Sequence, residues 1–408
     1  MKKFKLSLIL TIFFIILIYI CKIDSIPESI ILLQGEKLEI DTIFGLKIEY
    51  NEETVEASSN LKEDISSTTG KTDLNLKLGN INVKDITVNV IPNKVVIPGG
   101  ETIGLKLYTN GVLVVGMSEI EGIDSIKYKP YENSGIEEGD MIVKIDDKTI
   151  TCTADLIQEV NNSLGNTLEV SYVREGTIYD TNIVPAQTDS NEYKLGLWVR
   201  DAAAGVGTVT FYEPETGMFA ALGHGIVDVD TEEIINISSG EVVTSNIVSI
   251  TKGQKGKPGE IRGSIENGKT LGTVYDNTKF GIFGKLNNTS MTQLKNNKEM
   301  EILPRTEVET GKASIICTIE NNKQEEYEIE IEKIYKNNNE DNKSMIIKVT
   351  DEKLIEKTGG IIQGMSGSPI IQNGKFVGAV THVMVNDPTI GYGVFADMML
   401  KQMREVKK

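Results

Sequence analysis

Histidine is scarce in this chain, because its 408 residues contain only His224 and His382. A mechanism that needs a histidine base therefore has two candidates. Cysteine is nearly as scarce: Cys21, Cys152 and Cys317 lie far apart, with no Cys-x-x-Cys pair and no cysteine–histidine cluster at zinc spacing. We expect no disulfide framework, no metal site and no cofactor.

Basic charge is also in short supply. The chain has 42 lysines and arginines against 59 aspartates and glutamates, a net charge of −17. Nucleic acid binding requires basic patches that displace counterions from phosphates, so we expect no nucleic acid partner. The length allows two or three domains, and 38 glycines with only ten prolines indicate a globular chain rich in turns.

The N-terminus carries a targeting pattern. Lys2, Lys3 and Lys5 precede an apolar run of 16 residues, 6–21, and no small-x-small cleavage signature follows. Residues 1–23 are predicted to be a signal anchor that holds the chain at a membrane, with a cytoplasmic N-terminus and all later residues exported. A cleaved signal peptide with a poor cleavage site is the alternative.

Residues 24–95 contain short alternating runs such as "INVKDITVNVI", which predict half-buried strands. We expect a small β-rich segment here and assign no chemistry to it.

Residues 96–188 combine glycine turns, short strands and one helix-like stretch, "TADLIQEVNNSLG". With "NSGIEEGDMIVKIDDKTI", the pattern resembles a PDZ domain. The resemblance implies a peptide-binding loop in "TIGLKL", where backbone N–H groups around Gly104 and Leu105 would receive the terminal carboxylate of a peptide. A PDZ domain that only packs against its neighbour remains the alternative.

Residues 195–408 are rich in strands broken by glycine and asparagine, which predicts an all-β barrel domain. His224 lies among small residues in "GMFAALGHGIVD", a context suited to a side chain that emerges from a tight turn. Ser366 lies in "GMSGSP", where Gly364 and Gly367 permit a turn that exposes the hydroxyl. A serine nucleophile needs a base, which His224 can supply, and the N–H groups of Gly364 and Ser366 are candidates for the oxyanion hole.

The serine segment resembles that of the chymotrypsin-like serine peptidases, with the turn followed by strand "IIQ", turn "NGK" and strand "FVGAVTHV". Ser368 replaces the second glycine of that family. The expected fold class is therefore mainly β, a chymotrypsin-like double β-barrel preceded by a PDZ domain and a signal-anchor helix. In this alignment Thr381 would lie beneath the histidine, and His382 would face the substrate channel as a pocket-lining residue.

The order of signal anchor, PDZ domain, "ALGHGIVD" and "GGIIQGMSGSPIIQNGKFVGAVTHVMVNDPTIGYGV" resembles the SpoIVB serine peptidases of endospore-forming bacteria. The resemblance implies export into the space between the two forespore membranes. It also implies cleavage of a membrane-bound regulatory protein that leads to sigma-factor precursor processing, together with self-cleavage. The PDZ ligand would be a C-terminus or a segment of the same chain. A PDZ receptor with an inactive barrel is the competing hypothesis.

The sequence leaves two candidates for the acidic residue of the catalytic triad. The resemblance places the family's functional aspartate on Asp351, which lies 15 residues before Ser366 and thus within the second barrel. A triad acid must reach the far ring nitrogen of the histidine, and by topology Asp276 in the first barrel is better placed. The predicted catalytic residues are therefore His224, Ser366 and Asp351, with Asp276 as the alternative acid.

Overall fold

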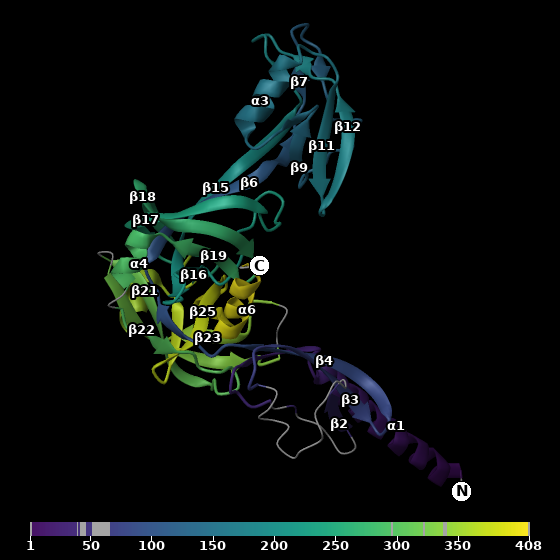
Figure 1. Ribbon diagram of the computed structural model, residues 1–408, viewed down its shortest axis with the longest axis vertical. Coiled ribbons are helices and arrows are strands. Elements are labelled where there is room, and N and C mark those ends of the chain that lie inside the picture. The colour runs from purple at the N-terminus through teal and green to yellow at the C-terminus, as the bar shows by residue number, and fades with distance from the viewer. Residues whose placement is uncertain are drawn as a thin grey trace.

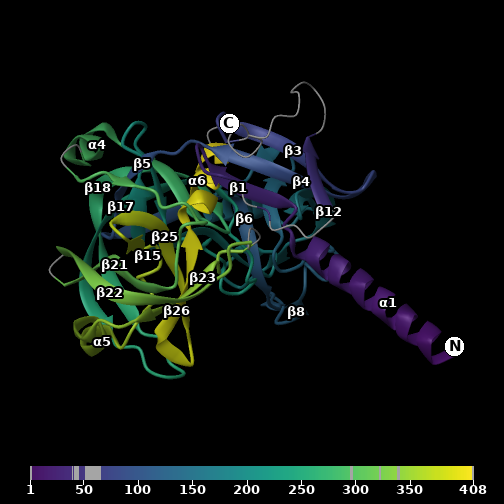
Figure 2. The same cartoon turned by 90° about the horizontal axis from the view of Figure 1, so that it is seen from below.

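The computed structural model describes residues 2–38, 40, 46–50, 66–294, 297–320, 323–337 and 341–406. The chain begins with helix α1 (Lys2–Ser25), which projects away from the body of the protein (Figures 1 and 2). The side chains of the predicted anchor lysines 2, 3 and 5 lie outside the described residues. Over the described part of the chain, no helix has both the length and the apolar character required to cross a membrane.

A four-stranded sheet follows α1, in the order β1-β4-β3-β2. Its strands are β1 (Ser29–Leu33), β2 (Leu46–Tyr50), β3 (Gly70–Leu78) and β4 (Ile81–Ile91). The alternating residues Ile86, Val88 and Val90 of β4 are buried with Leu74 and Leu76 of β3. This period of two is the one that the sequence shows, and the segment is β-rich as predicted.

The first barrel closes through a ring of six strands, β6-β17-β18-β19-β16-β15, because β15 also pairs with β6. Their bounds are β6 (Thr102–Met117), β15 (Leu197–Tyr212), β16 (Met218–Ala221), β17 (Ile237–Thr251), β18 (Glu260–Thr278) and β19 (Gly281–Leu286). Strands β5 (Val95–Pro98) and β20 (Met300–Glu301) extend it beside β15, and α4 (Asn288–Leu294) follows β19. Ile103, Leu105 and Leu107 alternate along β6 into the core of this barrel.

The PDZ module lies at the far end of strands β6 and β15, at the top of Figure 1. Its sheet contains the C-terminal part of β6 with β9 (Met141–Ile145), β11 (Leu168–Arg174) and β12 (Thr177–Ile183). Helix α3 (Thr153–Asn162) packs on it through Leu156 and Val160. Short pairs complete it: β7 (Ile120–Glu121) with β8 (Lys127–Tyr128), β10 (Lys148–Thr149) with β9, and β13 (Ala186–Gln187) with β14 (Tyr193–Lys194).

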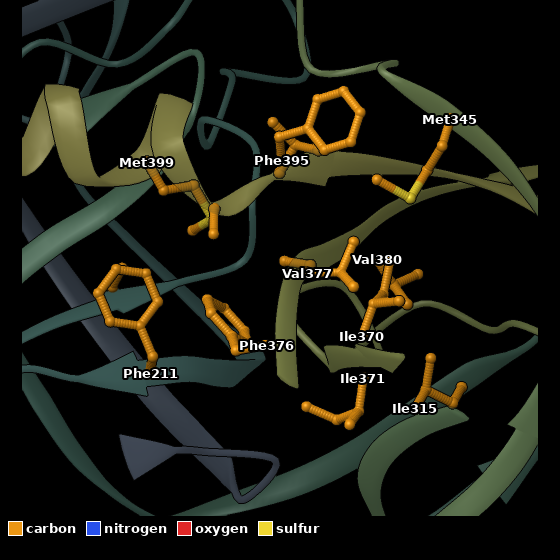
Figure 3. Packing of buried hydrophobic residues seen from close by; sticks show 14 of the residues in the cluster. Phe211, Ile315, Met345, Ile370, Ile371, Phe376, Val377, Val380, Phe395 and Met399 are labelled. Atoms are coloured by element: carbon orange, nitrogen blue, oxygen red, sulfur yellow. The ribbon is translucent and has the colours of Figure 1, made fainter. Parts of the chain in front are cut away.

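The second barrel is a closed ring of six strands, β21-β22-β23-β26-β25-β24. They are β21 (Gly311–Glu320), β22 (Lys323–Ile334), β23 (Met345–Val349), β24 (Pro369–Gln372), β25 (Lys375–Met384) and β26 (Asp387–Phe395), with α5 (Glu352–Thr358) before β24 and α6 (Ala396–Val406) at the end. Phe211 of the first barrel meets Phe376 of the second edge-on, with ring centroids 5.4 Å apart, beneath Met399 of α6 (Figure 3). Such a pair adds about 0.5–1.5 kcal/mol beyond the area that it buries.

The PDZ domain and the peptidase domain do not simply follow one another along the chain, as the sequence had led us to expect. Residues 102–108 of β6 pair with residues 202–208 of β15 and also with β17, so they form the first strand of the peptidase barrel. Farther along the same two strands, residues 113–117 pair with residues 197–200 inside the PDZ module. The PDZ module is therefore an insertion in the first barrel. The predicted domain boundary at residue 96 is wrong, because it assigns residues 102–108 of β6 to the PDZ domain although they belong to the barrel.

Candidate active site

His224 follows a tight turn at the end of β16. Leu222 and Gly223 both have positive φ, 69° and 70°, and the N–H of Leu222 donates to the carbonyl of Thr208 at 3.1 Å. A side chain at Gly223 would come within 3.0 Å of Thr381 Cγ2 in the second barrel. Glycine is needed because it tolerates both the positive φ and the close approach. The turn therefore presents the imidazole at the junction of the two barrels.

The imidazole of His224 is oriented by its own loop. Nδ1 lies 2.8 Å from the carbonyl oxygen of Gly225, an acceptor that leaves the proton on Nδ1 and the lone pair on Nε2. Burial lowers the pKa of His224, because a charged ring is poorly solvated there. The ring is thus neutral near pH 7, as a general base must be.

Ser366 lies on a turn held by two glycines, Gly364 with φ 98° and Gly367 with φ 97°. A side chain at Gly367 would come 2.1 Å from the carbonyl oxygen of Thr208 and 2.6 Å from the nitrogen of Leu222. The serine turn is therefore pressed against the loop that carries His224. The hydroxyl of Ser366 donates to the carbonyl of Thr381 at 2.7 Å, so attack requires rotation of Oγ toward the imidazole.

Two backbone N–H groups around Ser366 are oriented so that they are available to a substrate. The carbonyl of Gln363 accepts from the N–H of Ile261 at 2.8 Å, and the carbonyl of Met365 accepts from the Ser368 hydroxyl at 2.6 Å. In a trans peptide the next N–H points the opposite way. Those N–H groups belong to Gly364 and Ser366, and within the described residues neither donates a hydrogen bond.

His382 lines the site beside His224. Its ring lies 4.8 Å from that of His224 at an angle of 33°, and it follows Thr381, the acceptor of the Ser366 hydroxyl. Burial, with a smaller contribution from His224, lowers the pKa of His382 to about 4. Its Nδ1 is buried and has no hydrogen-bond partner among the described residues. The structure thus brings His224 and Ser366 together, with His382 lining the site.

The two candidate acids lie elsewhere. Asp351 caps α5, accepting from the N–H of Leu354 at 2.9 Å, and its second oxygen lies 3.4 Å from the N–H of Glu328. Asp276 is half-buried on β18, and burial raises its pKa. No hydrogen bond joins either carboxylate to His224 in the described part of the chain. A direct contact of Asp351 or Asp276 with the histidine therefore stays a prediction.

Gly104 and Leu105 do not lie at a peptide-binding edge, which corrects the expectation. In β6, Gly104 pairs with Val206 and Val243, and Leu105 is 1% exposed in the barrel core. Their backbone groups face two neighbouring strands, so a ligand's carboxylate has no access. The reason is the alternation of apolar residues in "TIGLKL", which buries one face of this strand in the barrel.

A groove of about 550 Å³ lies instead between α3 and the start of β15. Ile157 and Val160 of α3 line it opposite Leu195 and Trp198. Gly196 has φ 78°, and the N–H groups of Leu195 and Gly196 donate to no backbone acceptor among the described residues. The motif "KLGLW" repeats the apolar–Gly–apolar pattern of "TIGLKL", and this was the signal in the sequence for this loop.

Two further residues hold the site and were missed from the sequence. The amide of Asn277 accepts from the N–H of Ile226 and donates to its carbonyl, each at 2.8 Å, which fixes the loop after His224. Thr208 contacts both the histidine loop and the serine turn. No local pattern marks either residue, because their partners lie about 50 and 150 positions away in sequence.

Comparison with known families agrees with this site. The SpoIVB peptidase S55 family model matches residues 191–400, just over half of the chain, and includes both His224 and Ser366. The chain belongs to the SpoIVB peptidase S55 family. It is a serine endopeptidase, and a PDZ domain model matches residues 103–184. The SpoIVB family model omits β6, which completes the first barrel.

Several solved structures are similar to parts of the chain. The HtrA-type protease AlgW with a decapeptide is 14% identical over 51% of this chain and 54% of its own, with a TM-score of 0.31. The serine endoprotease from Yersinia pestis is 14% identical over 49% of this chain and 57% of its own, with a TM-score of 0.29. The PDZ domain of the SdrC-like protein from Listeria monocytogenes is 17% identical over 22% of this chain and 87% of its own, with a TM-score of 0.18. The two protease alignments span little more than half of the matched proteins.

Proposed function

We propose that this peptidase is exported and cleaves a membrane-associated regulatory protein as an intercompartmental signal during endospore formation, leading to sigma-factor precursor processing. Membership of the SpoIVB family supports this role. The observation that carries the chemistry is the contact between the serine turn and the histidine loop, where Gly367 leaves no room for a side chain against Leu222. The intermembrane space of the forespore is the proposed compartment.

The proposed reaction uses only side chains and amides of this chain. Ser366 Oγ attacks the carbonyl carbon of the scissile peptide bond while its proton passes to Nε2 of His224. The N–H groups of Gly364 and Ser366 stabilise the oxyanion of the tetrahedral intermediate. His224 then gives the proton to the leaving amine. Water, deprotonated by the same nitrogen, hydrolyses the acyl-enzyme and restores Ser366.

Helix α1 supports the proposed attachment to a membrane. Its apolar side chains from Leu10 to Ile20 are largely exposed, for example Phe13 at 64%. A soluble domain rarely exposes such a continuous apolar surface without a partner. We propose that α1 inserts into the membrane before cleavage, and that self-cleavage near the N-terminus releases the enzyme.

The PDZ ligand is proposed to be an extended peptide, either the C-terminus of another protein or a segment of this chain. On one side, residues 197–200 of β15 pair with residues 113–117 of β6, which leaves their other edge beside α3. A peptide strand can add to such an edge while its side chains enter the groove. The amides of Leu195 and Gly196 are placed to receive a terminal carboxylate.

Substitution of the nucleophile tests the peptidase and its self-cleavage. In Ser366→Ala we expect fluorophosphonate labelling and cleavage to fall below detection, because no hydroxyl remains to attack, while the thermal unfolding midpoint stays within a few degrees. After export, the variant should also remain longer than the unsubstituted protein. Labelling of Ser366→Ala equal to that of the unsubstituted protein would refute the mechanism. If the variant and the unsubstituted protein had equal size after export, the proposal of self-cleavage would be refuted, but the peptidase mechanism would not.

A further inference from the structure

Thr208 of β15 forms hydrogen bonds with both the serine turn and the histidine turn of the active site. Its hydroxyl donates to the carbonyl of Gly364 at 2.7 Å, and its N–H donates to the carbonyl of Ser366 at 3.2 Å. Its own carbonyl accepts from the N–H of Leu222 in the histidine turn at 3.1 Å. The side chain is 1% exposed, so water does not compete for these bonds.

The conformation of Gly364 needs such support. A glycine with φ 98° has many accessible backbone angles, and no side chain restricts it. Two bonds fix the peptide planes on either side. The carbonyl of Gln363 is held by the N–H of Ile261, and the carbonyl of Gly364 is held by the Thr208 hydroxyl. The first bond sets the direction of the Gly364 N–H, because that N–H lies in the same peptide plane as the Gln363 carbonyl. The second bond fixes the Gly364–Met365 peptide, which links the Gly364 amide to the amide of Ser366.

We propose that Thr208 is a positioning residue of the oxyanion hole, acting through its hydroxyl on the Gly364 carbonyl. It does not touch the substrate. Its hydroxyl holds the Gly364–Met365 peptide, and this fixes the direction of the Gly364 N–H relative to the Ser366 N–H, so that both amides donate to one oxyanion. Loss of the bond lets the Gly364–Met365 peptide rotate, so the amides of Gly364 and Ser366 no longer converge on one point. The stabilisation of the transition state then falls while substrate binding does not. The inference rests on the serine peptidase site proposed above.

The same strand supplies a matched control. Thr210 lies two residues farther along β15 and is fully buried, like Thr208. Within the described residues its hydroxyl has no hydrogen-bond partner. Thr208→Val and Thr210→Val therefore make the same chemical change in the same strand, and only the first removes a bond to the serine turn. Thr208→Ser keeps that bond.

The experiment compares these three variants in the full chain. Each is assayed with a fluorogenic peptide selected from a library on the unsubstituted protein, and with a peptide boronic acid, which forms a tetrahedral adduct with the serine. In Thr208→Val we expect kcat to fall about 10-fold to 100-fold, somewhat less than the loss of an oxyanion-hole donor. The affinity for the boronic acid should fall by a similar factor with KM little changed. Thr208→Ser should recover kcat to within about threefold, and Thr210→Val should match the unsubstituted protein in the same assay.

Three results would overturn the proposal: an unchanged kcat in Thr208→Val, an equal loss in Thr210→Val, or a loss confined to KM. If Thr208→Val does not fold, Thr208→Cys replaces it, because a thiol is a much weaker hydrogen-bond donor than the serine hydroxyl. In that case kcat must be lower in Thr208→Cys than in Thr208→Ser. Absence of labelling and cleavage in the unsubstituted protein would instead be a failure of the proposed function.

Discussion

At the scale of single residues, glycines and one leucine let the two barrels approach closely enough for chemistry. Leu222 has φ 69°, a conformation that an L-residue rarely adopts. Its backbone bond to Thr208 and its contact with Gly367 hold it there. Backbone strain of this kind persists where the surrounding structure fixes it, often at functional sites. The precise placement of His224 depends on this turn.

Substitutions of Asp351 can separate its role as the cap of α5 from a role of its negative charge in catalysis. Its carboxylate caps α5, and α5 ends shortly before the segment that carries Ser366. Asparagine caps helices as well as aspartate does, whereas alanine costs about 1 kcal/mol. We therefore expect Asp351→Ala to lower the free energy of unfolding by about 1 kcal/mol, measured by urea denaturation, and Asp351→Asn to leave it nearly unchanged.

The activity of Asp351→Asn then decides the role of the carboxylate. Since no hydrogen bond joins Asp351 to His224 among the described residues, we expect the rate of fluorophosphonate labelling to stay within a few-fold of the unsubstituted protein. A stable Asp351→Asn that loses about 10⁴-fold in rate would instead support the catalytic acid that the sequence predicts. Asp276→Asn, measured alongside, tests the other acid.

At the scale of elements, β15 links the peptide groove to the nucleophile. It starts beside α3 at Leu197, and Thr208 near its other end bonds to the serine turn. Near its start, the guanidinium of Arg200 pairs with Asp228 and Asp230 in the loop that follows His224. A single strand therefore contacts the groove, the histidine loop and the serine turn.

The groove itself is tested by charge placed on α3. Ile157 is 56% exposed and lines the groove, while Ile178 on β12 is 65% exposed and does not line it. We expect Ile157→Lys to weaken binding of fluorescent peptides with free C-termini ending in valine, leucine or phenylalanine at least fivefold by fluorescence anisotropy, since a charged side chain removes apolar contact area.

The matched control is Ile178→Lys, for which we expect unchanged affinity. Peptides with an amidated C-terminus should bind weakly, because the amides of Leu195 and Gly196 would lose a charged acceptor. Equal weakening by both lysines would place the ligand elsewhere. Equal binding of acid and amide peptides would exclude the proposed carboxylate loop.

At the scale of the whole molecule, the PDZ module is inserted in the first barrel, and excision tests this. Thr109 and Asp201 are neighbours across the ribbon, joined by a bond of 3.0 Å from the Thr109 hydroxyl to the Asp201 carbonyl. Replacement of residues 111–199 by Asn-Gly should therefore close β6 and β15 as a hairpin. We expect this shortened chain to fold and to be labelled at Ser366.

Deletion of residues 96–188 is the contrasting variant. It removes β6, so the ring of six strands cannot close and the buried faces of β15 and β17 lose their partner. We expect an aggregated or unfolded protein without labelling, checked by circular dichroism and size-exclusion chromatography. Labelling of this variant, with none in the Asn-Gly replacement, would contradict the insertion.

The sequence by itself determined a mainly β fold with a PDZ module, and it predicted the pair His224 and Ser366. These rest on local signals: alternating apolar residues in strands, glycines at turns that need positive φ, and a histidine in a chain that has only one other. Their information lies within a few residues, so it can be read without the fold.

Only the tertiary structure decided which neighbours each of these short motifs has, and therefore whether it is buried or borders a groove. "TIGLKL" and "KLGLW" share a pattern, but the first is buried between β15 and β17 while the second borders the groove beside α3. The bonds of Thr208 and Asn277 likewise join segments distant in sequence. Strand pairing and hydrogen bonding between distant segments depend on closure of the barrels, which no short stretch of sequence encodes.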